Sequence, residues 1–207
     1  MTALRLLVYD RTCRGPGLGR RLSSAWAAGS VLYRALRRLD ASHGASGWEE
    51  ALGWLTSYEP DRPIREVQFW GHGRWGCVLI GKQALGRAAL RPGDPHYEAC
   101  ARLRARLVPG GEALVWLRTC EAFGAEAGQD FARALTDFFG CRVAGHTFTI
   151  GYWQSGLHSL VPGGVPDWPL DEGLAAGTPR MPERALPSLP GAPHTISCLR
   201  GEIPEGW

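Results

Sequence analysis

Short apolar runs alternate with helical patterns along the first 150 residues. Buried strands are expected over 3–9, 67–70, 113–117 and 141–150, the last broken around Gly145-His146. Runs that are apolar throughout, rather than at every second position, are typical of parallel strands covered on both faces. The strand pattern therefore predicts a mostly parallel sheet.

Between these runs, apolar residues recur at steps of three and four, which places them on one face of a helix. Such faces occur in 22–39, 48–55, 95–107 and 124–139. Ser46-Gly47-Trp48-Glu49 has the spacing of a capping box, Asp94-Pro95 is typical of a helix start, and Gly140 is a helix stop. Residues 76–81 are expected to form a hairpin arm. No clear strand is predicted between Asp40 and Ile64.

The order of these elements favours an α/β fold with helices on both faces of the sheet. From Gly151 onward the character changes, because nine of the 15 prolines lie beyond position 160. We therefore predict an α/β core over 1–150. Residues 151–207 are expected to form a proline-rich segment of loops and short strands that packs on the same domain.

The composition narrows the class of protein. The chain has 207 residues, 44% of them hydrophobic, and a net charge of +3, which suits one globular domain and gives no argument for a nucleic-acid partner. No apolar stretch approaches the ~20 residues of a membrane helix, and Met1–Leu7 does not resemble a signal peptide. The six cysteines form no CxxC pair. We expect a cytoplasmic protein with free thiols, no metal and no membrane partner.

Two of the expected strands stop at a reactive side chain. His72 follows the run 67–70, and Cys120 follows the run 113–117. The carboxyl ends of parallel strands line the crevice where open α/β sheets bind ligands, and the intervening chain is long enough for a crossover to a neighbouring strand. A thiol beside an imidazole is a candidate nucleophile with its proton carrier. The sequence therefore predicts a Cys–His site at one edge of the sheet.

Backbone groups can complete such a site. A cysteine between a strand and a helix can offer its own N–H and a favourable helix field. Gly73 follows His72 and lets a substrate approach the backbone closely. The N–H groups of Gly73 and Cys120 are candidate donors to the oxyanion of an acyl-transfer reaction.

Trp70-Gly71-His72-Gly73, the hairpin after it, and Leu117-Arg118-Thr119-Cys120-Glu121 with Gly124 carry a family resemblance. These motifs resemble the caspase-like cysteine peptidases of clan CD, which also holds legumains and gingipains, and most of all its bacterial branch, the CHAT domains. In caspases the histidine also lies about 50 residues before the cysteine. The resemblance covers roughly 3–150. It implies a three-layer sandwich, Cys120 as nucleophile, His72 as general acid/base, and an oxyanion hole formed by Gly73 and Cys120.

The resemblance also bears on substrate choice. Arg118 stands where caspases have the Gln of Gln-Ala-Cys-Arg-Gly, which helps to line their P1 pocket. An arginine there would favour an acidic P1 side chain, or it would pair with a structural carboxylate. Asp167, Asp171 and Glu172 are alternative substrate-binding residues that would select a basic P1 side chain.

The implied function is that of a cysteine endopeptidase without a cofactor. Its substrate would be a protein or peptide, and its activity would be controlled by a partner protein, oligomerisation or self-cleavage. The bacterial resemblance implies a role in a defence or cell-death module. Glu121 directly follows the nucleophile, and its charge would raise the thiol pKa unless it points away. An inactive caspase-like binding or scaffold module is therefore the alternative.

Several other residues have more than one interpretation. The loop Gly15–Arg21 suggests a nucleotide-binding regulator or a surface loop. Cys13 is a second reactive thiol or a surface cysteine, and His146 and His158 are a base, metal ligands or satisfied core residues. A phosphatase is excluded, since that chemistry needs an arginine six residues after the cysteine and Glu126 stands there.

Overall fold

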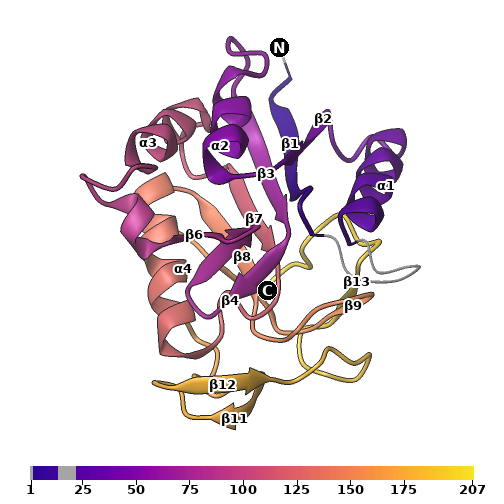
Figure 1. The fold of residues 1–207 in the computed structure, drawn as a ribbon, viewed down its shortest axis with the longest axis vertical. Helices are drawn as coiled ribbons and strands as arrows, with labels where there is room; N and C mark the ends of the chain where they lie inside the picture. The colour runs from indigo at the N-terminus through magenta and orange to yellow at the C-terminus, as the bar shows by residue number, and fades with distance from the viewer. Residues whose placement is uncertain (1, 14–21) are drawn as a thin grey trace.

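The computed structural model describes residues 2–13 and 22–207, so the predicted nucleotide loop Gly15–Arg21 lies outside the described residues (Figure 1). The central sheet has six strands in the order β10-β8-β7-β3-β1-β2. Their bounds are β1 Leu4–Asp10, β2 Ala41–Ala45, β3 Ile64–Trp70, β7 Leu114–Arg118, β8 Arg142–His146 and β10 Leu157–Leu160. The first five are parallel to one another, and β10 is antiparallel to β8.

Four α-helices accompany the sheet: α1 Leu22–Ala35, α2 Trp48–Ser57, α3 Tyr97–Arg106 and α4 Ala125–Phe139. Alternate residues of a strand point to opposite faces. Leu6 and Val8 belong to the apolar cluster that includes α2, α3 and α4, whereas Leu7 packs with Tyr33 of α1. Helices therefore cover both faces (Figure 1). The predicted mixed α/β fold is confirmed, and its layers are compatible with a three-layer sandwich.

The smaller strands lie outside the central sheet. Their bounds are β4 His72–Arg74, β5 Cys77–Ile80, β6 Gln83–Gly86, β9 Trp153–Gln154, β11 Leu174–Gly177, β12 Pro182–Ala185 and β13 Ile196–Ser197, with a 3-10 helix η1 at Arg87–Leu90. The predicted hairpin arm is part of a three-stranded sheet, β4-β5-β6. The segment after residue 150 packs on the core and supplies β10 to the central sheet.

Four local predictions were wrong. Residues 41–45 form β2, whose middle residues Ser42, His43 and Gly44 are only half-buried. As an edge strand it needs no apolar run. Helix α1 ends at Ala35 rather than residue 39. Residues 148–150 lie outside β8. Gly140, by contrast, ends α4 as predicted, in the left-handed conformation at φ 64°.

The start of α2 also differs from the prediction. Its N-cap residue is Gly47, and no side chain caps it. Ser46 instead pairs with Glu50, whose Oε2 accepts the Ser46 backbone N–H at 2.9 Å and its hydroxyl at 2.6 Å. The capping box predicted that Glu49 would accept the backbone N–H of Ser46. Glu50 makes this contact instead, and no side chain caps the helix.

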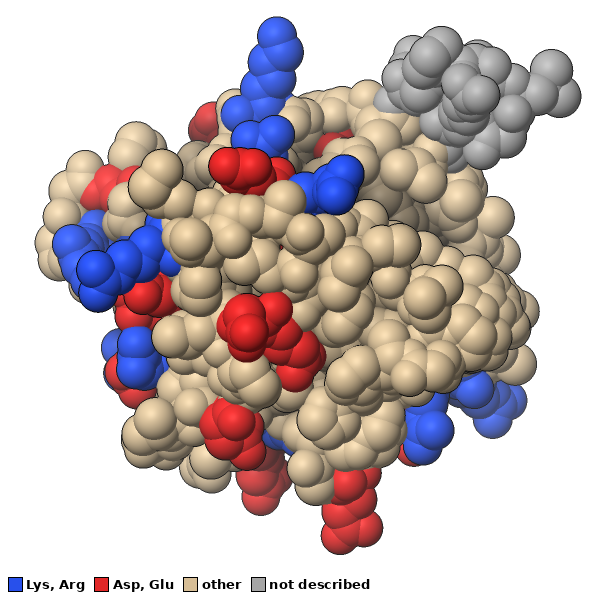
Figure 2. Space-filling model, turned by 90° about the horizontal axis from the view of Figure 1, so that it is seen from below, with Lys and Arg blue, Asp and Glu red and all other residues tan. Residues whose placement is uncertain are grey.

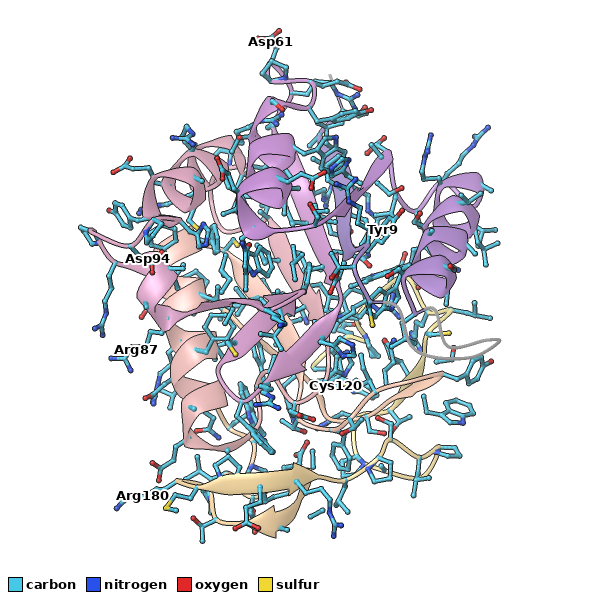
Figure 3. The ribbon with its side chains drawn as sticks, viewed as in Figure 1. Tyr9, Asp61, Arg87, Asp94, Cys120 and Arg180 are labelled. Atoms are coloured by element: carbon cyan, nitrogen blue, oxygen red, sulfur yellow. The ribbon has the colours of Figure 1, made fainter. Side chains whose placement is uncertain are left out.

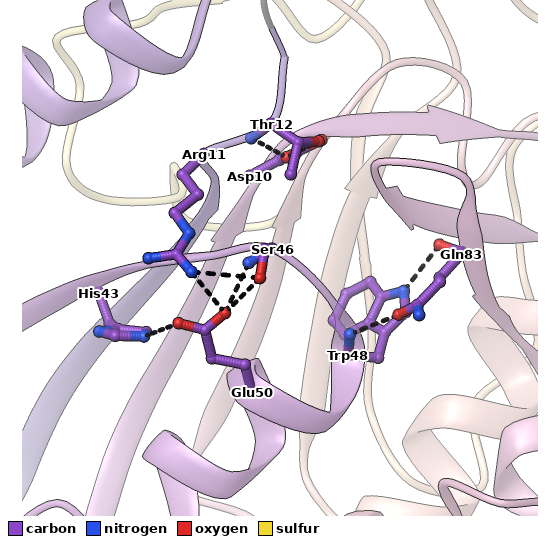
Figure 4. A network of polar contacts seen from close by, with 8 residues as sticks. All are labelled: Asp10, Arg11, Thr12, His43, Ser46, Trp48, Glu50 and Gln83. Atoms are coloured by element: carbon purple, nitrogen blue, oxygen red, sulfur yellow. Dashed lines mark hydrogen bonds and ion pairs between the residues drawn. The ribbon is translucent and has the colours of Figure 1, made fainter.

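Glu50 is the centre of a polar network around the carboxyl end of β1 (Figure 4). Besides Ser46 it binds Arg11 at 3.2 Å and His43 at 3.1 Å. The Ser46 hydroxyl and backbone N–H lower the pKa of the Glu50 carboxyl to about 2. Asp10, the last residue of β1, accepts the Gly81 backbone N–H at 3.0 Å. These contacts tie the end of β1 to α2 and to the hairpin.

Charge is spread thinly on the face seen in Figure 2. Most atoms there are uncharged, a few acidic side chains lie near the middle, and acidic and basic side chains are interspersed toward the rim. None of the helices in the described part of the chain is long and apolar enough to span a membrane.

Glu50→Gln should reduce the change in unfolding free energy that accompanies a fall in pH. Because the folded-state pKa lies below the unfolded one, the carboxylate stabilises the fold above pH 4.5 and this contribution is lost as the pH falls toward about 2. The half-exposed site limits the effect to about 1 kcal/mol. Urea unfolding at pH values across this range measures it. Glu49→Gln, on the exposed side of the same turn, is the control. An equal loss of pH-dependent stability in both variants would contradict the role given to Glu50.

Candidate functional site

The two predicted reactive residues follow neighbouring strands in matching register. Strand β3 pairs with β7, and Trp70 lies opposite Arg118. His72 and Cys120 each stand two residues beyond that pair. Parallel strands in register end at the same edge of the sheet. The sheet therefore brings His72 and Cys120 to the same edge.

Both residues line one cavity with a volume of about 420 Å³. Figure 3 shows Cys120 at the lower end of the central sheet. Helix α1 supplies part of the wall, including Trp26 and Tyr33. Residues of the C-terminal segment supply another part: Gly151, Tyr152, Gln154, Cys198 and Leu199. A cavity that is mostly apolar and has a few convergent polar groups is the usual form of a small-ligand or substrate site.

The thiol of Cys120 is held in its neutral form. Burial raises the pKa of the Cys120 thiol to about 11, and the charge of Glu121 adds to the rise. Its Sγ lies 3.9 Å from the carbonyl oxygen of Ile150. Glu121 has a left-handed backbone, φ 37°, and its carboxylate accepts a hydrogen bond from the Thr149 hydroxyl at 3.1 Å. At neutral pH Cys120 is thus a thiol rather than a thiolate.

His72 faces a different sulfur. Its Nε2 lies 3.0 Å from Sγ of Cys13, and its ring meets that of Trp26 edge-on at 5.9 Å. Within 2–13 and 22–207, no hydrogen bond joins His72 to Cys120. The Nε2 atom of His72 is therefore engaged by Cys13 and not by Cys120.

The place of Cys13 follows from the strand order. Strand β1 lies on the other side of β3 from β7, so the ends of β1, β3 and β7 are consecutive along the sheet edge. Asp10 accepts hydrogen bonds from the backbone N–H and the hydroxyl of Thr12, both at 2.7 Å, and so fixes the turn before Cys13. The sequence predicted Cys13 as a candidate reactive thiol but not its contact with His72, because strand order cannot be read from the chain.

Gly73 packs directly on the backbone of the Cys120 segment. A side chain at this position would collide with the carbonyl oxygen of Cys120, and its Cβ would lie 2.6 Å from Oγ1 of Thr119. Gly73 is also paired with Val78 in the β4–β5 ladder. The two predicted oxyanion donors, Gly73 and Cys120, thus belong to backbone segments in contact. Only glycine allows this approach.

Arg118 lies at the inner end of the cavity and is almost fully buried. Its guanidinium donates to Oε1 of Gln154 at 2.8 and 3.0 Å, to the hydroxyl of Tyr33 at 2.6 Å, and to the carbonyl oxygen of Cys198 at 2.9 Å. It also stacks 4.5 Å from the ring centroid of Trp116. Burial lowers the Arg118 pKa from its ordinary value. Among the described residues no carboxylate forms an ion pair with it.

The other candidates lie outside this cavity. Asp167 is exposed on the loop before Trp168 and does not line it. His146 is buried at the end of β8, where its Nδ1 lies 3.1 Å from the carbonyl oxygen of Ser155. Burial lowers the pKa of His146 to about 3, so the ring is neutral. His158 lies on β10 beside Glu172, with Nε2 2.8 Å from the carboxylate.

No model of a known protein family matches the sequence, and a search of curated proteins found no match.

Gly73→Ala should distort the Cys120 backbone. Because the added methyl group meets backbone and Thr119 atoms, we expect a loss of about 1–3 kcal/mol of unfolding free energy. Gly53→Ala is the matched control: Gly53 lies in the exposed interior of α2, with no atom near the added carbon, and it should gain up to about 1 kcal/mol. Urea denaturation measures both. Similar changes in the two variants would contradict the close contact at Gly73.

Cys120 should react slowly in the resting protein. With a pKa near 11, the thiolate population at pH 8 is about 100-fold smaller than for an ordinary thiol of pKa near 9. Iodoacetamide labelling followed by peptide mass spectrometry measures the rate at each pH. The rate should climb about tenfold per pH unit. A plateau near neutral pH would show that the resting thiol is already activated.

Proposed function

We propose that this protein is a caspase-like cysteine endopeptidase that hydrolyses peptide bonds through Cys120 and His72. The observation that carries the proposal is the in-register end of β3 and β7, which brings both side chains to one cavity. The close approach of Gly73 to the carbonyl oxygen of Cys120 supports it, because it brings together the two residues whose N–H groups would form the oxyanion hole.

The reaction follows from these groups. His72 takes the proton of the Cys120 thiol as Sγ attacks the scissile carbonyl carbon. The negative charge that develops on the carbonyl oxygen is stabilised by the N–H groups of Gly73 and Cys120. Protonated His72 gives its proton to the leaving amine, and the C–N bond breaks to leave a thioester on Cys120. Water then attacks the thioester with His72 as base, which restores the thiol and releases the carboxylic acid.

The resting geometry favours control of this activity. His72 contacts Cys13, and the buried Cys120 is neutral. Transfer of the proton from Cys120 requires His72 to turn or shift away from Cys13. Binding of substrate or of an activating partner protein, or self-cleavage in a loop, would supply that change. We propose a cytoplasmic enzyme that acts on a partner protein, in line with its resemblance to bacterial defence modules.

Arg118 supports a preference for an acidic P1 side chain. It is a buried cation at the inner end of the cavity, and neutral acceptors rather than carboxylates hold it. A substrate carboxylate that reached it would gain a charge-assisted interaction in a water-poor site. Asp167 lies away from the cavity, so the geometry gives less support to a basic P1 side chain.

The alternative is a binding module without turnover. The pKa of Cys120 near 11 and the contact of His72 with Cys13 both favour it. In that case the cavity would bind a peptide segment and leave it intact.

An activity-based probe separates the two functions. A peptide acyloxymethyl ketone should label Cys120, and His72→Ala should reduce the labelling rate at least about 100-fold by removing the general acid/base. His96→Ala, which removes a histidine outside the cavity, is the control for nonspecific effects. Intact mass and peptide mapping measure the label. Labelling of Cys120 at the same rate as Cys77, with and without His72, would end the peptidase proposal.

A peptide library with a varied P1 residue tests the role of Arg118. We expect kcat/KM for Asp or Glu at P1 to exceed that for Ala by at least tenfold, which corresponds to about 1.4 kcal/mol. Arg118→Gln should remove this ratio even if it lowers every rate. An unchanged P1 ratio in Arg118→Gln would show that the guanidinium only holds the fold.

A further inference from the structure

Three side chains from separate parts of the C-terminal segment meet away from the Cys120 cavity. They are His158 on β10, Glu172 just before β11, and His194 shortly before β13. One ligand atom from each residue lies within 4.8 Å of the other two. Residues far apart in sequence thus bring two imidazoles and one carboxylate to a single point.

His158 and Glu172, the two buried members of this group, already lie within hydrogen-bond distance of each other. Nε2 of His158 lies 2.8 Å from Oε1 of Glu172, and both side chains are largely buried, 7% and 11% exposed. Two ligands of one metal with bonds of about 2.1 Å are about 3.0–3.4 Å apart. His158 and Glu172 therefore need little movement to hold an ion. His194 is exposed, so the third ligand closes the site from the solvent side.

Aromatic rings fix the directions of the imidazoles. The ring of His158 stacks on Trp168 at 4.7 Å, and His194 meets Trp207 at 4.9 Å. The two imidazole rings are 4.8 Å apart and nearly perpendicular, at 80°. His194 also has a left-handed backbone, φ 44°, which is uncommon for a residue with a side chain.

Glu172 has the support typical of a metal-binding carboxylate. The hydroxyl of Thr147 donates to its Oε1 at 2.8 Å. Such outer contacts orient ligands, and their removal usually lowers metal affinity 10–100-fold. The carboxylate is thus directed toward His158 by a side chain from the core of the protein.

We infer that His158, Glu172 and His194 bind a divalent transition metal ion, with Zn²⁺ the best match. Two imidazoles and one carboxylate are a donor set that Zn²⁺ uses, with water as a fourth ligand. Ca²⁺ and Mg²⁺ prefer sets made entirely of oxygen atoms. The site is independent of Cys120, so it can exist whether or not the protein cleaves peptides.

The ion would fasten the C-terminal segment to the core. That segment has short strands and long loops, and a bound metal supplies folding energy where apolar packing is sparse. His194 lies just before β13, which pairs with β9. After β13, the carbonyl oxygen of Cys198 accepts hydrogen bonds from Arg118 and Tyr33. Metal binding at His194 would therefore also steady the wall of the Cys120 cavity.

Titration of the whole protein with Zn²⁺, followed by calorimetry and by thermal unfolding, tests the site. We expect one equivalent to bind and to raise the melting temperature, whereas Mg²⁺ and Ca²⁺ at the same concentration should not. His194→Ala should weaken binding at least about 100-fold, and Thr147→Val about tenfold. His194 is exposed, so its variant should remain folded. His96→Ala is the matched histidine control and should bind like the original protein.

Co²⁺ identifies the ligands directly. At this site its spectrum should lack a thiolate charge-transfer band, because the donors are nitrogen and oxygen. Metal binding that persists in His194→Ala and disappears in Cys13→Ser would place the metal at His72 and its neighbouring cysteine thiols. That result would overturn the inference. Absence of any Zn²⁺ binding to the folded protein would overturn it as well. Neither result depends on peptidase activity.

Discussion

The pairing of β3 with β7 is the constraint on which the candidate site depends. The register sets Trp70, the last residue of β3, against Arg118, the last residue of β7, and His72 and Cys120 each follow two residues later. A slip of one residue would turn every side chain of one strand to the opposite face. It would carry Arg118 out of its pocket and the thiol away from the imidazole. The buried Val67, Phe69, Val115 and Leu117 on one face resist such a slip.

Arg118 is the second element that holds the site together. Its guanidinium joins three regions that are distant in sequence: Tyr33 of α1, Gln154 of β9, and Cys198 after β13. An unpaired buried charge is costly, so each donor must be satisfied for the fold to keep it. The neutral acceptors satisfy the hydrogen bonds but leave the charge uncompensated. The same residue therefore fixes the cavity wall and leaves a positive potential at its inner end.

The sequence predicted the individual strands and helices better than it predicted which of them lie side by side. Continuous apolar runs indicated β1, β3 and β7, and Gly140 indicated the end of α4, because these signals are local. Strand β2 was missed since a half-exposed edge strand needs no apolar run. The contact of Cys13 with His72 depends on the order of strands in the sheet. The cluster of His158, Glu172 and His194 depends on loops that have no periodicity to read.

The proposed reaction must overcome the free-energy cost of ionising Cys120. With the pKa of Cys120 near 11, forming the free thiolate at pH 7 costs about 5 kcal/mol. That cost falls if the proton moves to His72 while Sγ attacks, because charge then passes to the oxyanion and the imidazolium instead of remaining on sulfur. Such a concerted step requires His72 to leave Cys13 only when a substrate carbonyl is in place. In the proposed reaction, the burial that raises the pKa of Cys120 would thus confine the attack of Sγ to the moment when a substrate carbonyl lies beside it.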